Sequence, residues 1–389
     1  MGMTRYKLFD DSEKYGGPAI DTESTFHFIN RAAGQQWQRV RDLIEHWYAD
    51  FHDPDGDLRH RLRSDDIRQH LPAWWELYVY TFLRRLEFEV EVHPTVSAST
   101  RKPDFRASNG ATAMYVECAA LVADDGAANP AGQAWICECI NGARNPDFMV
   151  EVDILASGTD QPTVNEIVKP IESWLKDLDY EQLSMLFDDT ADVTDAIFQF
   201  RDWKVRIAAL PVNEDSRGRD GRLIAWYPSN VTSLTLDGEG KIRNILKNKG
   251  SRYGELAAPL IVAIYAVSGF VEQRDMANAV FGSLAVTYRE NDLTSVKLIR
   301  QRDGYWRPPP SSRGSRVAGV LFAAQELKPW AIETTLPELW LNPWARMPTT
   351  VSFPVARHTA DDAGNISLTP ARTTPQQLFD LPAEWFEGK

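Results

Sequence analysis

The feature that most constrains this fold is an apolar run at residues 111–123, in which Glu117 is the single charged side chain. A strand that is apolar on both faces belongs in the middle of a sheet that other elements cover on both sides. Residues 259–267 form a second run of this kind and are apolar throughout. Together the two runs predict a parallel or mixed sheet with a buried centre.

Apolar spacing in the rest of the chain alternates between the helical period and the strand period. Helices are expected at residues 28–51, at residues 164–178, at residues 242–253, and from an N-cap at Ser64 to Leu86. Alternating helices and strands indicate an α/β protein. Strands are expected at residues 88–92, 104–106, 113–122, 148–155, 203–212, 223–227, 259–267 and 317–324.

Three segments are expected along the chain. Residues 1–60 would form an N-terminal helical accessory segment, and residues 61–270 would form the α/β core. Residues 271–389 would form a C-terminal extension that packs on this core.

The composition excludes several classes of protein. A net charge of -13 argues against a protein that coats nucleic acid with its whole surface, so any nucleic-acid contact must be local. Three cysteines, Cys118, Cys137 and Cys139, do not suggest a secreted disulfide framework. The chain has no apolar signal region near its first residue, and no apolar run reaches the roughly 18 residues of a membrane span. A soluble cytoplasmic protein without a membrane partner is therefore expected.

Glu76 is the single charged residue between Leu71 and Leu83. An ionised carboxylate among bulky apolar groups is costly unless it is paired or binds a metal. Glu76 could instead lie on the solvent edge of its helix and form a salt bridge to Arg84 or Arg85.

Glu117 and Asp104 can also be interpreted either as metal ligands or as residues with an ordinary structural role. In its apolar strand Glu117 requires a partner, which could be an arginine or a divalent cation. Asp104 follows Pro103, and Pro-Asp alone is a common turn dipeptide.

The combination of these residues is more specific than any one of them. A helix with Glu76, a strand, the sequence Pro103-Asp104-Phe105 and an apolar strand with Glu117 resembles the PD-(D/E)XK nuclease superfamily. The resemblance covers residues 64–122 and extends less clearly to 267. It implies a restriction-endonuclease-like mixed sheet flanked by helices, with accessory segments at both ends. It also implies Asp104 and Glu117 as catalytic metal ligands, Glu76 as a supporting ligand, and Mg²⁺ or Mn²⁺ as the metal that activates a water.

The sequence departs from the family pattern at one position. The family has a lysine two residues after the strand acid, whereas this chain has Ala119 there. Members of the superfamily are known to relocate this lysine, and two catalytic candidates exist. Lys102 precedes Asp104 by two residues, so both would point to one face of a strand. Lys249 begins Lys-Gly-Ser-Arg-Tyr, which resembles the Gln-xxx-Tyr helix motif of the exonuclease branch.

The helix expected at residues 242–253 is also locally basic. From Lys241 to Arg252 it carries five basic residues and no acidic one. Contact with nucleic-acid phosphates is one interpretation, and a solvated helix face balanced by acidic neighbours is the other. Under the first interpretation the nucleic-acid-binding residues are Arg243, Lys247, Lys249, Arg252 and Tyr253.

These observations lead to a ranked set of functions. The first is a metal-dependent phosphodiesterase that acts on DNA, with restriction or defence as a setting suggested by fold analogy. The second is a catalytically inactive nuclease-fold protein that binds nucleic acid or a protein partner. The third, an enzyme with Cys118 as nucleophile, has little support because the sequence shows no histidine partner for the thiol. A homodimer is compatible with each of these functions.

Overall fold

The computed structural model describes residues 6–20, 22–97, 99–110, 112–122, 129–190, 193–218, 222–226, 238–267, 271–289, 292–310, 312–324 and 327–386. The chain divides into two compact units. Unit 1 comprises Met1–Gly17, Ser24–Ala123 and Leu236–Lys389, and unit 2 comprises Pro18–Glu23 and Asp124–Thr235. These boundaries differ from the three segments expected from the sequence, because unit 1 draws on both ends of the chain.

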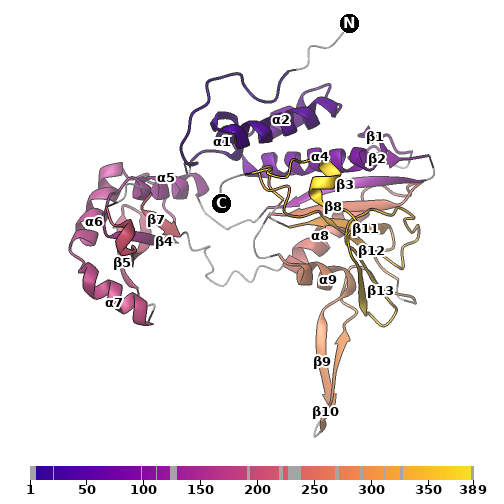
Figure 1. Ribbon diagram of the computed structural model, residues 1–389. Coiled ribbons are helices and arrows are strands. Elements are labelled where there is room, and N and C mark those ends of the chain that lie inside the picture. Colours follow the sequence, from indigo (N-terminus) through magenta and orange to yellow (C-terminus); the bar gives the residue numbers. More distant parts are fainter. Residues whose placement is uncertain are drawn as a thin grey trace. The chain divides into compact units, whose positions relative to one another are not determined.

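Unit 1 is built on an 8-stranded mixed sheet with the order β1-β2-β3-β8-β11-β12-β13-β14 (Figure 1). The central strands β3, β8 and β11 are parallel to one another, and β1, β2 and β3 are antiparallel neighbours. The strands are β1 (Glu89–Val92), β2 (Phe105–Ser108), β3 (Ala113–Leu121), β8 (Leu260–Ala266), β11 (Val317–Ala323), β12 (Glu338–Leu341), β13 (Arg357–Ala360) and β14 (Ile366–Thr369). The mixed α/β class expected from the two apolar runs is confirmed.

Helices cover both faces of this sheet, as the apolar character of β3 and β8 requires. Along β8, Ile261, Ala263 and Tyr265 pack on the side of helix α4 (Ile67–Arg85), where Trp75 Nε1 donates to the Ala263 carbonyl at 3.0 Å. The alternate residues of β8 pack on the side of α8 (Gly238–Gly250) and α9 (Gln273–Phe281). The helices α1 (Thr25–Arg31), α2 (Gln35–Asp50), α3 (Asp57–Leu62) and α10 (Pro375–Phe379) also belong to unit 1.

Unit 2 is an α/β unit, and all of it except Pro18–Glu23 lies in the sequence between β3 and α8. Its 4-stranded sheet has the order β5-β6-β4-β7 and its own buried core. The helices are α5 (Pro130–Asn141), α6 (Val164–Lys176) and α7 (Tyr180–Thr190), and the strands are β4 (Phe148–Ala156), β5 (Thr194–Phe200), β6 (Trp203–Pro211) and β7 (Ile224–Trp226). Cys137 and Cys139 are buried in α5, where they act as small core residues.

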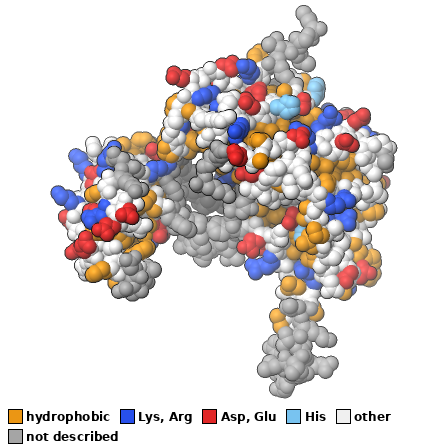
Figure 2. Space-filling view, in the orientation of Figure 1, with side chains coloured by type: hydrophobic (Ala, Val, Ile, Leu, Met, Phe, Trp, Pro, Cys, Tyr) orange, Lys and Arg blue, Asp and Glu red, His pale blue; other side chains and the backbone are white. Residues whose placement is uncertain are grey.

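A two-stranded hairpin of β9 (Leu284–Arg289) and β10 (Asp292–Arg300) extends away from the main sheet of unit 1 (Figure 1). Leu284, Val286 and Ile299 are exposed on it. On the face drawn in Figure 2, acidic and basic side chains are interspersed, without a broad field of one sign. None of the helices in the described ranges has the length and apolar content that a bilayer crossing requires.

In the N-terminal part of unit 1, two of the expected helix boundaries were wrong. The helix expected at residues 28–51 is two helices, because Gly34 takes a φ of 110° between α1 and α2, a conformation that glycine adopts readily. The N-cap of α4 is Asp66 and not Ser64, because an Asp66 carboxylate oxygen accepts from the Arg68 amide at 2.9 Å. Ser64 lies two residues earlier, and its hydroxyl oxygen accepts from the Asp66 amide.

The cap assignment gives a test of the fold. We expect Asp66→Ala to lower the free energy of unfolding by about 1 kcal/mol, because the first turn of α4 loses its side-chain acceptor. Asp66→Asn should retain most of the stability, since asparagine caps helices equally well. Urea denaturation followed by circular dichroism would measure both variants, and equal losses would contradict the capping role.

Candidate functional site

The candidate site lies in unit 1, where β2 and β3 are antiparallel neighbours. Asp104 directly precedes β2, and Glu117 lies in the middle of β3. Phe105 pairs with Val116, so continuation of the register by one residue brings Asp104 opposite Glu117. The Cys118 amide donates to Asp104 Oδ2 at 2.6 Å and so fixes the position of that carboxylate.

Glu117 is almost completely buried, with 1% of its surface exposed. Its carboxylate accepts from Lys249 Nζ at 2.5 Å and from Arg252 Nη1 at 2.9 Å, both at Oε1. The Tyr253 hydroxyl donates to the other oxygen, Oε2. Two cations and a phenol therefore compensate a charge that would otherwise be costly inside the sheet.

These partners come from the end of α8 and the turn that follows it. The expected helix extended to residue 253, whereas α8 ends at Gly250 and residues 251–253 form a turn. Gly250 allows a close approach at this point, because a Cβ there would lie 2.5 Å from the Tyr305 hydroxyl oxygen. Lys249 and Tyr253 thus reach Glu117 from a helix end and a turn, and not from one helical face as the sequence suggested.

Tyr253 is held as a neutral donor at this site. Burial raises its pKa, and the hydrogen bond to Glu117 raises it further because the negative carboxylate disfavours a phenolate. The same hydroxyl lies 3.3 Å from the Lys102 carbonyl oxygen.

Glu76 is the third acid, and it is 6% exposed. It pairs with Arg61 Nη2 at 2.8 Å and not with the two arginines expected, so both the solvent-edge position and that pairing were wrong. Arg84 donates to the Phe88 carbonyl, and Arg85 pairs with Asp380.

The Arg61 contact satisfies only one of the Glu76 carboxylate oxygens. The other, Oε1, is buried without a hydrogen-bond partner among the described residues, and His93 Nε2 is 4.0 Å from it. Burial raises the pKa of Glu76, and the positive charge of Arg61 partly offsets that rise.

Asp104 shows that the three acids share one electrostatic environment. Burial raises its pKa to about 7, and the negative charges of Glu117 and Glu76 contribute to the rise. The Cys118 amide and the positive charge of Lys249 act in the opposite direction. The centre is therefore short of positive charge at Asp104 and Glu76, although Glu117 itself is well compensated.

Other predicted site residues do not join this centre. The Lys102 side chain is exposed, and because β2 begins only at Phe105, the expected strand alternation does not apply to Lys102 and Asp104. Arg243 pairs with Glu239 one turn earlier, at 3.4 Å. Lys247 is exposed on α8. The basic residues expected to act together from Lys241 to Arg252 therefore have different surroundings. Lys249 and Arg252 contact Glu117, whereas Arg243 and Lys247 do not.

Cys118 is a poor candidate nucleophile. Burial raises the pKa of its thiol well above the ordinary value, and the negative charges of Asp104, Glu76 and Glu117 raise it further. Since the thiolate is the reactive form, this environment keeps the sulfur unreactive at neutral pH.

Sequence reasoning missed Arg61, which is the first residue of the expected α/β core at residues 61–270. Arg61 lies in α3 and bridges Asp57 and Glu76, with an Nε–Oδ2 distance of 2.8 Å to Asp57. Arg61 lies between Arg59 and Arg63, and nothing in the sequence marks one of these three arginines as the partner of an acid fifteen positions away, so this contact could not be found without the fold.

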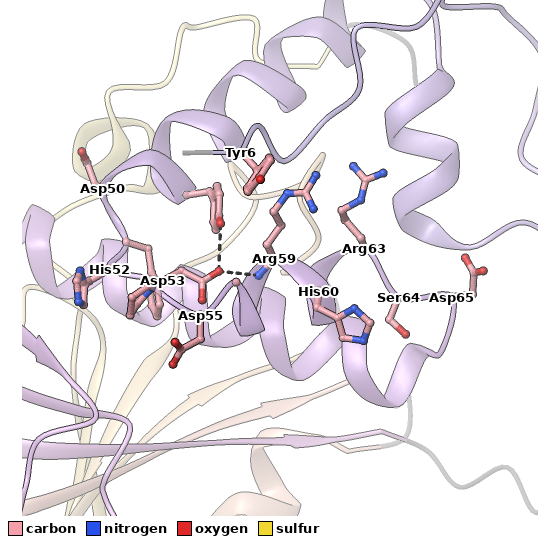
Figure 3. A pocket seen from close by; sticks show the side chains of 14 residues that line it. Tyr6, Asp50, His52, Asp53, Asp55, Arg59, His60, Arg63, Ser64 and Asp65 are labelled. Atoms are coloured by element: carbon pink, nitrogen blue, oxygen red, sulfur yellow. Dashed lines mark hydrogen bonds between the residues drawn. The ribbon is translucent and has the colours of Figure 1, made fainter. Parts of the chain in front are cut away.

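A cavity of about 1020 Å³ lies elsewhere, against α2, α3 and the turn between them (Figure 3). Its polar groups hold local structure. Asp53 caps α3 by accepting from the Leu58 and Arg59 amides. Arg59 and Arg63 donate to backbone carbonyls of the N-terminal segment. No residue of the acidic centre lines this cavity, so its size does not indicate the site of chemistry.

Within the part of the chain that the structure describes, no group of three or more His, Cys, Asp or Glu side chains is arranged to hold a metal ion. Comparison of the chain with family models, with curated proteins and with solved structures found no match. The interpretation of the site therefore depends on its geometry.

The raised pKa of Asp104 predicts a pH-dependent stability. The folded protein retains this proton up to about pH 7, whereas an unfolded chain releases it near pH 4, so stability falls as the pH rises through that window. We expect Asp104→Asn to be more stable than the wild type at pH 8, by on the order of 2 kcal/mol, and to gain little at pH 4. Asparagine can still accept from the Cys118 amide.

Denaturant unfolding at several pH values would measure this difference. Asp55→Asn, at an exposed carboxylate in the turn before α3, is the matched control. A gain for Asp104→Asn that did not change with pH would contradict the assignment.

Proposed function

We infer that this chain is a metal-dependent phosphodiesterase acting on nucleic acid, with DNA favoured, and that unit 1 contains a PD-(D/E)XK nuclease core. One observation carries the inference. The Lys249 amine contacts Glu117 next to Asp104, which is where a relocated family lysine would be needed because Ala119 occupies the usual position.

The order of elements supports this inference. Helix α4 with Glu76 is followed by β1, β2 and β3, which is the arrangement that suggested the family from the sequence. After the inserted unit 2, α8 supplies Lys249, and β8 then pairs with β3 in parallel. These six elements form the proposed core, and the sheet continues beyond it through β11 to β14.

The acids fit a magnesium or manganese ion in their chemistry. Hard divalent cations prefer oxygen ligands, and Mg²⁺ is often held by only one or two carboxylates together with water and substrate phosphates. Asp104 and Glu117 would be its ligands, and Oε1 of Glu76, which is buried and has no hydrogen-bond partner among the described residues, makes Glu76 suitable as a supporting ligand. When bound, such an ion would stabilise phosphate charge and favour ionisation of a water.

The remaining residues have roles that follow from their contacts. Lys249 and Arg252 would present positive charge to a phosphate at the mouth of the acidic centre. Tyr253 orients Glu117 through its hydroxyl, and the Cys118 amide orients Asp104. Arg61 compensates Glu76 and would act as a positioning residue.

A second candidate function is supported by a different observation. Both Glu117 oxygens are engaged by protein donors, and the described residues contain no cluster of three or more potential metal ligands in a binding arrangement. A catalytically inactive nuclease-fold protein that binds nucleic acid through Lys249 and Arg252 would have these properties.

A cleavage assay distinguishes the active phosphodiesterase from the inactive nucleic-acid-binding protein. With Mg²⁺ or Mn²⁺ present, we expect the purified protein to cleave DNA, and we expect Asp104→Asn or Glu117→Gln to slow cleavage roughly a thousandfold. Lys249→Ala should cost less, about a hundredfold, because the carboxylates remain. Lys169→Ala, at an exposed position on α6, serves as the matched control and should cleave at the wild-type rate.

Gel analysis of a labelled duplex and a labelled single strand would measure these rates. Salt-sensitive binding without cleavage under either ion would favour the inactive protein instead. Undiminished cleavage by Glu117→Gln would indicate a contaminating nuclease and overturn the proposed function.

A further inference from the structure

A small pocket lies beside the acidic centre, and of the residues that line it only Tyr253 was predicted from the sequence to be functional. Its volume is about 160 Å³, and it is formed by the end of α8, residues 253–260, Ser315, Arg316, Arg346 and Met347. Tyr253 lines this pocket and also donates to Glu117, so one side chain connects the two sites.

The segment that closes one side of the pocket is strongly basic. Residues 304–325 contain Arg307, Arg313 and Arg316 but no acidic residue, although the chain has a net charge of -13. The segment is held against α8, because Gly250 would place a Cβ 2.8 Å from Val317 Cγ2, and Val317 follows Arg316 directly. The positive charges of Arg316 and Arg313 also lower the pKa of Tyr305, opposing the larger effect of burial.

Arg346 brings a second guanidinium to the pocket from a distant part of the chain. Its amide donates to the Ser315 carbonyl at 2.7 Å, which fixes residue 346 beside residue 316. Its guanidinium lies 3.4 Å from Glu255, and both side chains are largely exposed, at 62% and 85%. An exposed pair of this kind contributes little stability, so Arg346 can exchange Glu255 for a phosphate at low cost.

The inner surface of the pocket is apolar. Leu256, Ala258, Leu260 and Met347 line it. Its volume is well below the roughly 300–1,000 Å³ of pockets for drug-sized ligands, so it suits a single base and not a whole dinucleotide cofactor. An apolar recess with cations at its rim matches the two parts of a nucleotide, the flat base and the charged phosphate.

We propose that this pocket is a nucleotide subsite for the nucleic-acid strand that reaches the acidic centre. The base of one nucleotide lies against Leu256 and Met347, and its phosphate is bound by Arg316 and Arg346. The strand then passes Arg252 and Lys249 to reach Glu117. The identity of the strand as a substrate rests on the proposed function, whereas the binding itself does not require cleavage.

Binding of a labelled single-stranded oligonucleotide, followed by fluorescence anisotropy in EDTA, would test the subsite without cleavage. Arg316→Ala and Arg346→Ala should each weaken binding about tenfold, and each should reduce the slope of log K against log salt by about 1. Arg372→Ala is the matched control, because Arg372 is also exposed but contacts Ser352, and it should bind as the wild type does. An abasic residue at one position should weaken wild-type binding in the same way.

Cleavage measured with Mg²⁺ on the same variants separates this inference from the proposed function. Both pocket variants should raise KM about tenfold and leave kcat unchanged, since Arg316 and Arg346 line the pocket and are not among the partners of the acidic centre described above. Cleavage with wild-type KM in both variants would overturn the subsite and leave the nuclease assignment standing. Weakened binding without cleavage by any variant or the wild type would support the subsite and overturn the nuclease assignment. Absence of oligonucleotide binding by the wild type would overturn the subsite.

Discussion

The carboxylate of Glu117 is the constraint around which unit 1 is organised. A charge in the middle of a central strand cannot be left uncompensated, and removal of one partner of a buried ion pair commonly costs about 3–5 kcal/mol. Lys249, Arg252 and Tyr253 meet this requirement, and to do so the end of α8 must lie over β3. That position in turn depends on the bare backbone of Gly250 against Tyr305. The same contacts that satisfy a buried charge therefore bring a lysine amine to the acids.

Sequence reasoning succeeded where the signal is local and failed where it is tertiary. The apolar run around Glu117 predicted β3 closely, because a strand that is buried on both faces consists almost entirely of apolar residues. The partners of Glu76 were wrong, because Arg61 approaches from another helix and no spacing rule reports that contact. The C-terminal strands β12 to β14 have only four residues each. An alternation of apolar and polar residues over so short a stretch is too weak a signal to predict a strand.

The acidic centre also shows how stability and chemistry can be opposed. Glu117 is compensated, whereas burial and neighbouring charges disfavour ionised Asp104, and one oxygen of Glu76 has no hydrogen-bond partner within the described part of the chain. A fold selected for stability alone would replace these two acids with neutral residues of similar size. Their presence together, on a helix and at the start of a strand, is the reason that a functional interpretation is favoured over a purely structural one.

The insertion of unit 2 between β3 and α8 has a consequence for the order in which the chain folds. Strands β3 and β8 are direct neighbours in the sheet, but the larger part of unit 2, Asp124–Thr235, separates them in the sequence. Such non-local pairing is slow to form, whereas unit 2 has its own core and can assemble as soon as it leaves the ribosome. During synthesis, the strand with Glu117 must therefore wait for Lys249, Arg252 and Tyr253, which are made only after the inserted part of unit 2.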